Sequence, residues 1–252
     1  MNQSELVGQQ TVIPERMNLY SLLRHPESRY LVFKRLLDIS LVLLSLIPLA
    51  PIFILLAVLI RLDSKGPAIY KQERVGARLG FLRGSPCWIR KRFTMYKFRT
   101  MKNDAKATIH YEFVRAYITN DSSLSEIKAM RKANAIYKLV NDPRVTRVGH
   151  FLRKNSLDEL PQLWNVLLGD MSLVGPRPPL PYEVEMYKPR HHQRLEALPG
   201  ITGLWQIKGR SSTTFEEMVV LDLEYIQKQC LWLDLKIMFG TLPAVLSRKG
   251  AQ

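Results

Sequence analysis

The sequence predicts an α/β protein that is mainly helical, with an N-terminal re-entrant membrane hairpin (helix-break-helix), a cytoplasmic domain and interfacial amphipathic helices. Three observations predict this: an uncharged apolar run from Ile39 to Ile60, two prolines near its middle, and basic residues at both ends. About 20 apolar residues suffice for a helix to cross a bilayer. We therefore divide the chain into a cytoplasmic lead-in (1–33), the hairpin (34–65) and a cytoplasmic domain (66–252).

Pro48 and Pro51 indicate that the apolar run does not cross the bilayer as one straight helix. Each proline lacks the N–H of the helical ladder and clashes with the preceding turn. Lys34 and Arg35 precede the run and Arg61 follows it. Because cytoplasmic segments collect Lys and Arg, both ends favour the same side of the membrane. A membrane break at Pro48 and Pro51, with entry and exit through one face, satisfies both observations.

Three other interpretations of this run compete with the hairpin. A buried core helix seldom lacks charge for such a length in a chain of this size. A spanning helix with a proline kink is compatible with the sequence if a neighbouring group, such as Ser45, satisfies the backbone group freed by Pro48. A cleaved signal peptide is disfavoured, because the run follows a polar segment and no small-residue cleavage pattern comes after it.

Basic residues dominate the segment that follows the apolar run. The 252-residue chain has a formal net charge of +15, and from Arg61 to Lys102 twelve basic residues stand against two acidic ones. Such a block favours phosphate groups, which occur in anionic lipids, nucleotide diphosphates and nucleic acids. Because the sequence has no nucleic-acid recognition motif, membrane lipids are the expected partner and nucleic acid is not. Cys87 and Cys230 form no disulfide framework or metal cluster, which fits a reducing cytoplasm.

The elements after the hairpin can be placed coarsely. In chain order we predict a turn at 63–67, short β-like runs at 68–70 and 93–96 separated by a basic loop, helical spacing within 103–140, and helices over 215–246. The stretch 231–239 combines Trp, Phe and Met with Lys, which is typical of a helix lying flat at a membrane interface.

The stretch 153–164 contains the strongest candidates for chemistry. Ser156 and Glu159 have the spacing of a capping box, and an apolar stripe follows at helical spacing, made of Leu157, Leu160, Leu163, Trp164 and Leu167. On this structural interpretation Asp158 only complements the helix dipole. A catalytic interpretation is compatible with it, because the helix start and nearby Arg153 favour an ionised Asp158, as attack on phosphorus requires. Glu159 could hold a hard divalent cation.

A second candidate is the segment Gly175–Pro179, in which prolines surround Arg177. The prolines fix the backbone, so the planar guanidinium is presented with little freedom, which suits bidentate phosphate binding. The alternative is a rigid loop with a solvated arginine. His191 and His192 lack carboxylate or cysteine neighbours at ligand spacing, so no zinc site is expected.

The ordered motifs together resemble the bacterial sugar transferases, the monotopic phosphoglycosyl transferases, over about Lys34 to Gly250. The motifs are Lys34-Arg35-x-x-Asp38, Gly66-Pro67, Gln72-x-Arg74-x-Gly76, Lys97-Phe98-Arg99-Thr100-Met101, Asp142-Pro143-Arg144-x-Thr146-x-x-Gly149, Ser156-x-Asp158-Glu159-Leu160-Pro161-Gln162, Gly175-Pro176-Arg177-Pro178, Gly200-x-Thr202-Gly203, Gly209-Arg210 and Asp222-x-x-Tyr225. The chain departs from the family pattern at the membrane break, where Ala50-Pro51 replaces Ser-Pro. It also lacks the extra N-terminal membrane helices of the large members, so a catalytic-core form is expected.

The resemblance implies transfer of a sugar-1-phosphate from a UDP-sugar to polyprenyl (undecaprenyl) phosphate, with release of UMP, at the cytoplasmic face of the bacterial inner membrane. It implies that Asp158 is the nucleophile, that Asp158 and Glu159 are the catalytic pair and hold Mg²⁺, and that Arg177 belongs to the family's Pro-Arg-Pro element. We further expect phosphate or substrate binding by four other cations, Lys97, Arg99, Arg153 and Arg210. Such a step starts assembly of exopolysaccharide, capsule, O-antigen or glycoprotein glycans.

Two other classes of function are compatible with the sequence. One is a transferase whose apolar segment spans the membrane. The other is a non-catalytic membrane adaptor that binds anionic lipid through the 61–102 basic block, which the presence of Asp158, Glu159 and Arg177 together disfavours. The end of the chain resembles the members that transfer hexoses, such as glucose or galactose. A homodimer is also compatible with the sequence.

Overall fold

The computed structural model of the protein describes residues 26–82, 85–102, 108–119, 144–209 and 213–246. Over these residues the chain is mostly helical with two small sheets, which confirms the coarse prediction of a mainly helical α/β protein. In chain order the elements are α2 (Pro26–Asp63), β1 (Ile69–Leu82), β2 (Ser85–Phe98), α3 (Thr108–Thr119), α5 (Arg147–Lys154), the 3₁₀ turn η2 (Leu157–Glu159), α6 (Gln162–Leu168), β3 (Ser172–Val174), α7 (Pro181–Glu185), α8 (Pro189–His192), η3 (Gln193–Leu195), β4 (Gly200–Thr202), α9 (Leu204–Lys208), α10 (Phe215–Lys228) and α11 (Leu231–Leu246).

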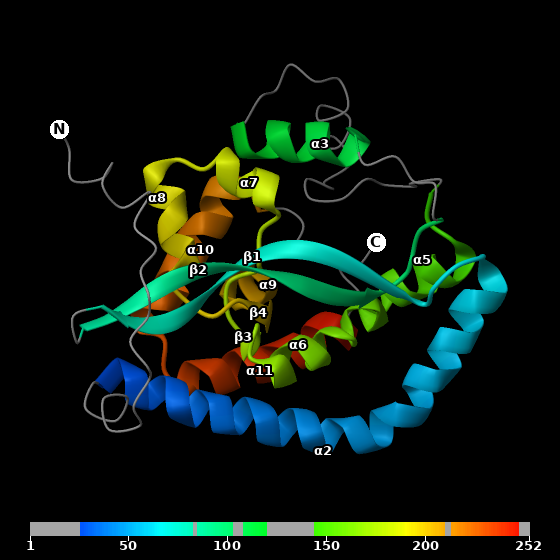
Figure 1. Cartoon of the computed structure of the whole chain (residues 1–252), viewed down its shortest axis with the longest axis horizontal. Coiled ribbons are helices and arrows are strands. Elements are labelled where there is room, and N and C mark those ends of the chain that lie inside the picture. Colours follow the sequence, from blue (N-terminus) through cyan, green and yellow to red (C-terminus); the bar gives the residue numbers. More distant parts are fainter. Residues whose placement is uncertain (1–25, 83–84, 103–107, 120–143, 210–212, 247–252) are drawn as a thin grey trace.

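Helix α2 contains the apolar run and lies along one edge of the molecule, bending along its course (Figure 1). By length and composition it could cross a membrane, and only 11% of its most apolar window is buried. It starts at Pro26, earlier than the predicted start at Lys34, and continues through Pro48 and Pro51 as one helix. Ser45 donates to the carbonyl oxygen of Val42, and so does not satisfy the group freed by Pro48. The re-entrant topology stays a prediction.

Strands β1 and β2 form one long antiparallel hairpin, in register from the pair Ile69 and Phe98 to the pair Leu82 and Ser85. The prediction of two short runs separated by a basic loop was wrong, because the basic residues continue both strands. Three successive cations, at 90–92, fall on both faces of β2 and hide the alternation that marks a strand.

Two clusters of buried residues pack α2 against the hairpin and the segment that follows it. One cluster contains Val42, Phe93, Met95, Val166 and Met171. The other contains Leu56, Ile60, Ala68, Phe98 and Leu152. In Figure 1, α6 and α11 lie between α2 and the hairpin. The apolar helix is therefore part of the same core as the candidate catalytic segment.

The rest of the chain covers the other side of the hairpin. In Figure 1, α7, α8 and α10 lie across the hairpin from α2, with α3 beyond them. Strands β3 and β4 form a short parallel sheet. The predicted helices over 215–246 are confirmed as α10 and α11, and the predicted turn is confirmed by the end of α2 at Asp63 and the positive φ of Gly66. Of the predicted helical region 103–140, α3 is described and 120–140 lies outside the described residues.

Candidate active site

Asp158 and Glu159 lie in the short 3₁₀ turn η2, which directly precedes α6. Ser156 before this turn has a left-handed backbone conformation, with φ 55°, and its side chain makes no capping hydrogen bond. The capping-box prediction for Ser156 and Glu159 was therefore wrong. A turn of three residues also lacks the run of aligned peptide dipoles on which the predicted dipole effect on Asp158 depends.

The predicted apolar stripe is only partly inward-facing. Trp164 is 56% exposed and Leu168, at the end of the same helix, is 54% exposed. By contrast, Val166 of α6 is fully buried. Large apolar side chains exposed side by side are unusual on a surface that faces water, and they fit contact with lipid.

Glu159 is held between two cations that come from distant parts of the chain. Its Oε1 atom lies 2.9 Å from Nζ of Lys97, near the end of β2, and 3.5 Å from Nη1 of Arg177, in the loop after β3. The Lys97 side chain is 14% exposed and those of Glu159 and Arg177 about a quarter exposed, so this charge cluster is partly shielded from water. The structure thus brings Lys97, Glu159 and Arg177 together, with Asp158 in the same turn as Glu159.

Burial affects the charge state of Lys97. Loss of solvent lowers the pKa of its ammonium below the ordinary lysine value, and the nearby Arg177 and Arg74 lower it further. The carboxylates of Glu159 and Asp158 oppose this effect but do not cancel it. Three cations and two carboxylates therefore interact in one place, an arrangement suited to exchanging partners with an incoming diphosphate.

The β1–β2 hairpin fixes both α6 and the loop around Arg177, the two segments beside this cluster. On one side, Asn165 of α6 donates to the carbonyl of Thr94 and accepts from the N–H of Tyr96, which holds α6 against β2. On the other side, Arg74 donates to the carbonyl of Pro178, and the N–H of Val75 donates to Pro179.

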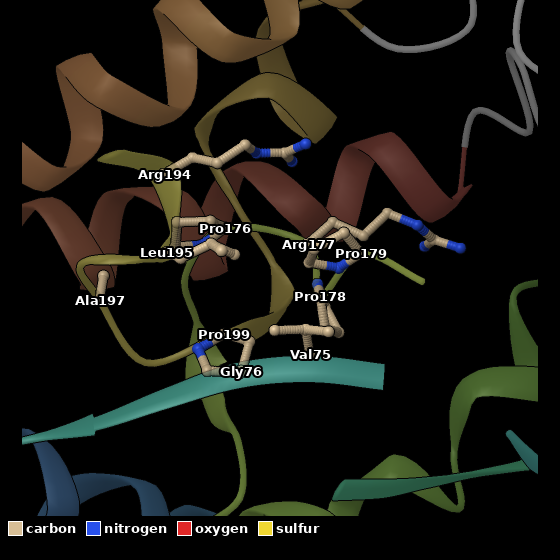
Figure 2. A pocket seen from close by; sticks show the side chains of 10 residues that line it. All are labelled: Val75, Gly76, Pro176, Arg177, Pro178, Pro179, Arg194, Leu195, Ala197 and Pro199. Atoms are coloured by element: carbon tan, nitrogen blue, oxygen red, sulfur yellow. The ribbon is translucent and has the colours of Figure 1, made fainter. Parts of the chain in front are cut away.

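The proline segment around Arg177 lies over β1. Pro176, Pro178, Pro179 and Pro199 surround a small hollow whose floor includes Val75 and Gly76. Figure 2 shows Arg177 extending away from these prolines. The guanidinium therefore reaches from the proline segment to Glu159, with which it pairs, and phosphate binding by Arg177 stays a prediction.

Two other predicted phosphate-binding cations make hydrogen bonds within the fold. The two Nη atoms of Arg99 donate to the carbonyls of Ser64 and Lys65, at 2.6 and 2.7 Å, where the chain leaves α2. Arg153 donates through Nε to the Thr100 hydroxyl at 2.9 Å. These contacts hold the fold together, and phosphate binding by Arg99 and Arg153 stays a prediction. Arg210 lies outside the described residues.

Two residues that support the site were missed as site residues. Arg74 is 6% exposed and Asn165 is fully buried, and each ties a catalytic segment to the hairpin. Both lie in or beside the recognised motifs, so the signal that could have found them was motif membership. Local periodicity could not, because their partners lie far away in the sequence.

The two carboxylates of the turn have the chemistry to hold a hard divalent cation, and magnesium binding stays a prediction. Among the described residues no group of three or more His, Cys, Asp or Glu side chains could hold a metal ion. Asp158 and Glu159 therefore supply a carboxylate pair and not a full set of ligands. Mg²⁺ is usually bound through one or two carboxylates together with substrate phosphates and water.

Comparison with known proteins identifies the family. The family model described as bacterial sugar transferase matches residues 29–248. The chain is 42% identical to the galactosyl transferase CpsE of Streptococcus agalactiae, over 88% of the chain and 44% of the relative. It is 42% identical to the undecaprenyl-phosphate galactose phosphotransferase of Salmonella typhimurium, over 89% of the chain and 42% of the relative.

A shorter relative matches over nearly its whole length. The exopolysaccharide production protein ExoY of Sinorhizobium fredii is 38% identical over 87% of the chain and 88% of the relative. The chain thus spans less than half of the two longer relatives and most of the shorter one. On the family match and these identities, the chain belongs to the bacterial sugar transferase family.

Proposed function

We propose that the protein transfers a sugar-1-phosphate from a UDP-sugar to polyprenyl phosphate, with release of UMP, as the first membrane step of surface glycan assembly. The observation that carries this proposal is the placement of Glu159 between Lys97 and Arg177, with Asp158 in the same turn. Relatives named as undecaprenyl-phosphate galactose and glucose phosphotransferases support a hexose as the sugar and undecaprenyl phosphate as the acceptor.

The reaction proceeds in two displacements at one phosphorus atom. A carboxylate oxygen of Asp158 attacks the sugar-linked β-phosphorus, the bond from that phosphorus to the bridging oxygen breaks, and UMP leaves with the electron pair. A phosphate oxygen of the polyprenyl acceptor then attacks the same phosphorus, and the bond to Asp158 breaks. Nucleophilic catalysis of this kind divides one difficult transfer into two easier ones.

The cations and carboxylates have distinct tasks in this scheme. Arg177 presents a planar fork that can bind two phosphate oxygens, and Lys97 supplies a second positive charge. Bound Mg²⁺ would neutralise charge that develops on the phosphates, and Asp158 and Glu159 are the residues that would hold it. Phosphate oxygens of a bound substrate would replace Glu159 as partners of Lys97 and Arg177, and the Glu159 carboxylate would then be available to hold Mg²⁺.

The apolar surface supports attachment to a bilayer, which we place at the cytoplasmic face of the bacterial inner membrane. Large apolar side chains are exposed along α2, and further ones are exposed on three other helices: Phe151 on α5, Trp164 and Leu168 on α6, and Trp232 and Phe239 on α11. Trp232 also lies beneath Lys236, whose Nζ is 5.2 Å from the ring centre. Aromatic residues beside lysine are typical of helices at a membrane interface.

The test is a reaction with a panel of UDP-sugars, Mg²⁺ and undecaprenyl phosphate, in which UMP release is measured. Incubation with the UDP-sugar alone should add the mass of one sugar phosphate to the intact protein and release UMP before the acceptor is present. The Asp158→Asn variant keeps the side-chain shape but loses the nucleophile, so it should form no adduct and turn over near background.

The matched control is Asp170→Asn, which removes a carboxylate from the loop after α6 that pairs with Lys91 at 2.8 Å. This variant should form the adduct at the normal rate. An adduct that persists in Asp158→Asn would move the nucleophile elsewhere. Absence of UMP release from every UDP-sugar, by a folded and membrane-bound protein, would overturn the proposed reaction.

A further inference from the structure

One turn of α2 carries three polar residues that contact the catalytic domain. Lys34, Arg35 and Asp38 open the apolar segment, and each makes contacts with residues more than a hundred positions further along the chain. Lys34 and Asp38 are each 3% exposed. The burial of Lys34 is unusual for a cation at a membrane boundary, because the charged end of such a side chain normally stays among water and headgroups.

Arg35 closes the C-terminal end of α6. Its Nη1 donates to the carbonyl of Val166, and its Nη2 donates to that of Leu167 at 2.7 Å. The last carbonyls of a helix have no partner within the helix, and a cation near them is favoured by the helix dipole. The helix itself ends at Gly169, whose φ of 80° a residue with a side chain rarely adopts.

Asp38, three residues after Arg35 on α2, holds strand β3. Its Oδ1 accepts from the N–H of Leu173 at 3.2 Å, in the middle of that three-residue strand. β3 leads directly into the segment that carries Arg177. Arg35 therefore contacts α6 and Asp38 contacts β3. Glu159 lies just before α6 and Arg177 just after β3, so the two contacts hold the segment that joins these residues.

Lys34 joins the same turn to the C-terminal helices. Its Nζ lies 2.7 Å from Oδ2 of Asp234, and both side chains are almost fully buried. Tyr225 lies 2.7 Å from the other oxygen of Asp234 and 3.3 Å from the carbonyl of Val174. This cluster thus touches the last residue of β3, so a third contact fixes the strand before Arg177.

We propose that the Lys34–Asp38 turn is a positioning device, through which the seating of α2 sets the distance between Glu159 and Arg177. The proposal rests on the proposed function for its catalytic consequence. The residues act through α6 and β3 and touch no reacting atom. The competing explanation treats Lys34 and Arg35 as cations that bind headgroups, for which their charge alone matters.

The experiment separates charge from hydrogen-bond geometry at Arg35. Arg35→Lys keeps the charge but cannot reach both carbonyls with a planar fork, whereas Arg29→Gln removes a charge from an exposed position on the same helix. We expect Arg35→Lys to raise amide exchange at 166–175 by about tenfold or more, with α10 unchanged. Its kcat should fall about tenfold, with a smaller change in KM and unchanged flotation on anionic vesicles. Arg29→Gln should change neither exchange nor kcat.

A second pair of variants, at Asp38, tests the same proposal independently if Arg35→Lys does not fold. Asp38→Asn keeps an oxygen that accepts from Leu173, whereas Asp38→Ala removes it. Faster exchange at Leu173 in Asp38→Ala, with near-normal exchange in Asp38→Asn, supports positioning. Normal exchange and kcat in both Arg35→Lys and Asp38→Ala would overturn it. The exchange measurement decides the positioning claim even if no UDP-sugar is turned over, so failure of the proposed function is seen separately.

Discussion

Substitution by glutamine separates the ion pairs of Glu159 from its proposed metal binding. Its Oε1 pairs with Lys97 and Arg177, and its charge is needed if it holds the metal. Glu159→Gln retains an oxygen that can accept from both cations, so the fold should persist. We expect turnover to fall about 10²-fold or more, as for loss of one preorganised electrostatic group, with half-saturation at a higher Mg²⁺ concentration. Initial rates in a magnesium titration measure both effects.

The control for this prediction is Glu196→Gln, at an exposed position after η3. It should leave the magnesium dependence unchanged. Wild-type rates and an unchanged magnesium titration for Glu159→Gln would remove Glu159 from the proposed metal site.

At the scale of single residues, the sequence located the turn but misjudged its geometry. Ser156 and Glu159 have capping-box spacing, yet the left-handed conformation of Ser156 excludes the box. Spacing reports which residues could meet in a regular helix, and this segment is a 3₁₀ turn. The contact between Lys97 and Glu159 joins residues 62 positions apart, so no local pattern could have predicted it.

The buried ion pair between Arg194 and Asp222 holds α10 against η3. The Nε and Nη2 atoms of Arg194 donate to one oxygen of Asp222, at 3.0 and 2.6 Å, and Nη1 donates to Tyr187. Arg194→Met leaves a buried carboxylate without its partner, which should lower the free energy of unfolding by about 3–5 kcal/mol. Thermal or denaturant unfolding in detergent measures this loss.

The loss should depend on pH in a defined direction. Burial raises the pKa of Asp222 to about 6, above its unfolded value, although Arg194 opposes the shift. The folded state therefore binds the proton more tightly, so the cost of the buried charge is full above pH 6 and is relieved as pH falls toward 4. Removing Arg194 takes away the charge that opposes the shift, so the pH dependence of the free energy of unfolding should be larger in Arg194→Met than in the wild type. Lys228→Met, which breaks an exposed pair with Glu224, should cost about 0.3–0.5 kcal/mol. An equal, pH-independent loss in both variants would contradict the prediction.

At the scale of elements, predictions succeeded where apolar periodicity is strong and failed where charge obscures it. The helices over 215–246 were predicted and are present as α10 and α11. The β1–β2 hairpin was predicted only near its open end, because cations occupy both faces of β2 in its middle. Cross-strand pairing joins residues far apart in the sequence, and it overrides the weak local preference of such a segment.

At the scale of the whole molecule, the basic residues of the hairpin should strengthen binding to anionic membranes. Lys91 and Arg92 form ion pairs with Asp170 and Glu73, but the basic side chains are more than half exposed. Exposed pairs contribute little to stability, so neutralising Arg90, Lys91 and Arg92 together should preserve the fold. Binding to anionic vesicles should weaken by about 1 kcal/mol per well-placed residue, and binding to neutral vesicles should not change. Equal loss on both kinds of vesicle would show that the block acts through folding.

The two ends of α2 contact one and the same domain, which bears on how the helix sits in a bilayer. Near its start Arg35 donates to carbonyls of α6, and at its end Asp63 accepts from the N–H of Val148 in α5. If α2 crossed the membrane, the domain that contacts both ends would have to enter the apolar layer as well. Irregular backbone facing lipid is not tolerated in that layer, and the β1–β2 hairpin of the domain carries many charges, which are costly to place there.

We therefore expect residues before and after α2 to lie on the cytoplasmic side. Single cysteines are placed at Gln3 or Gln252 in a background where Cys87 and Cys230 are serine. A membrane-impermeant thiol reagent should label both positions from the same side of the membrane. Labelling of the two positions from opposite sides would end the re-entrant interpretation. Pro48→Leu with Pro51→Leu serves as the comparison, because removing both prolines restores two helical N–H groups and relieves the clash that favours a bend. This double variant should shift part of the population toward a spanning helix. That shift would separate the two ends of α2, so transferase activity should fall in proportion.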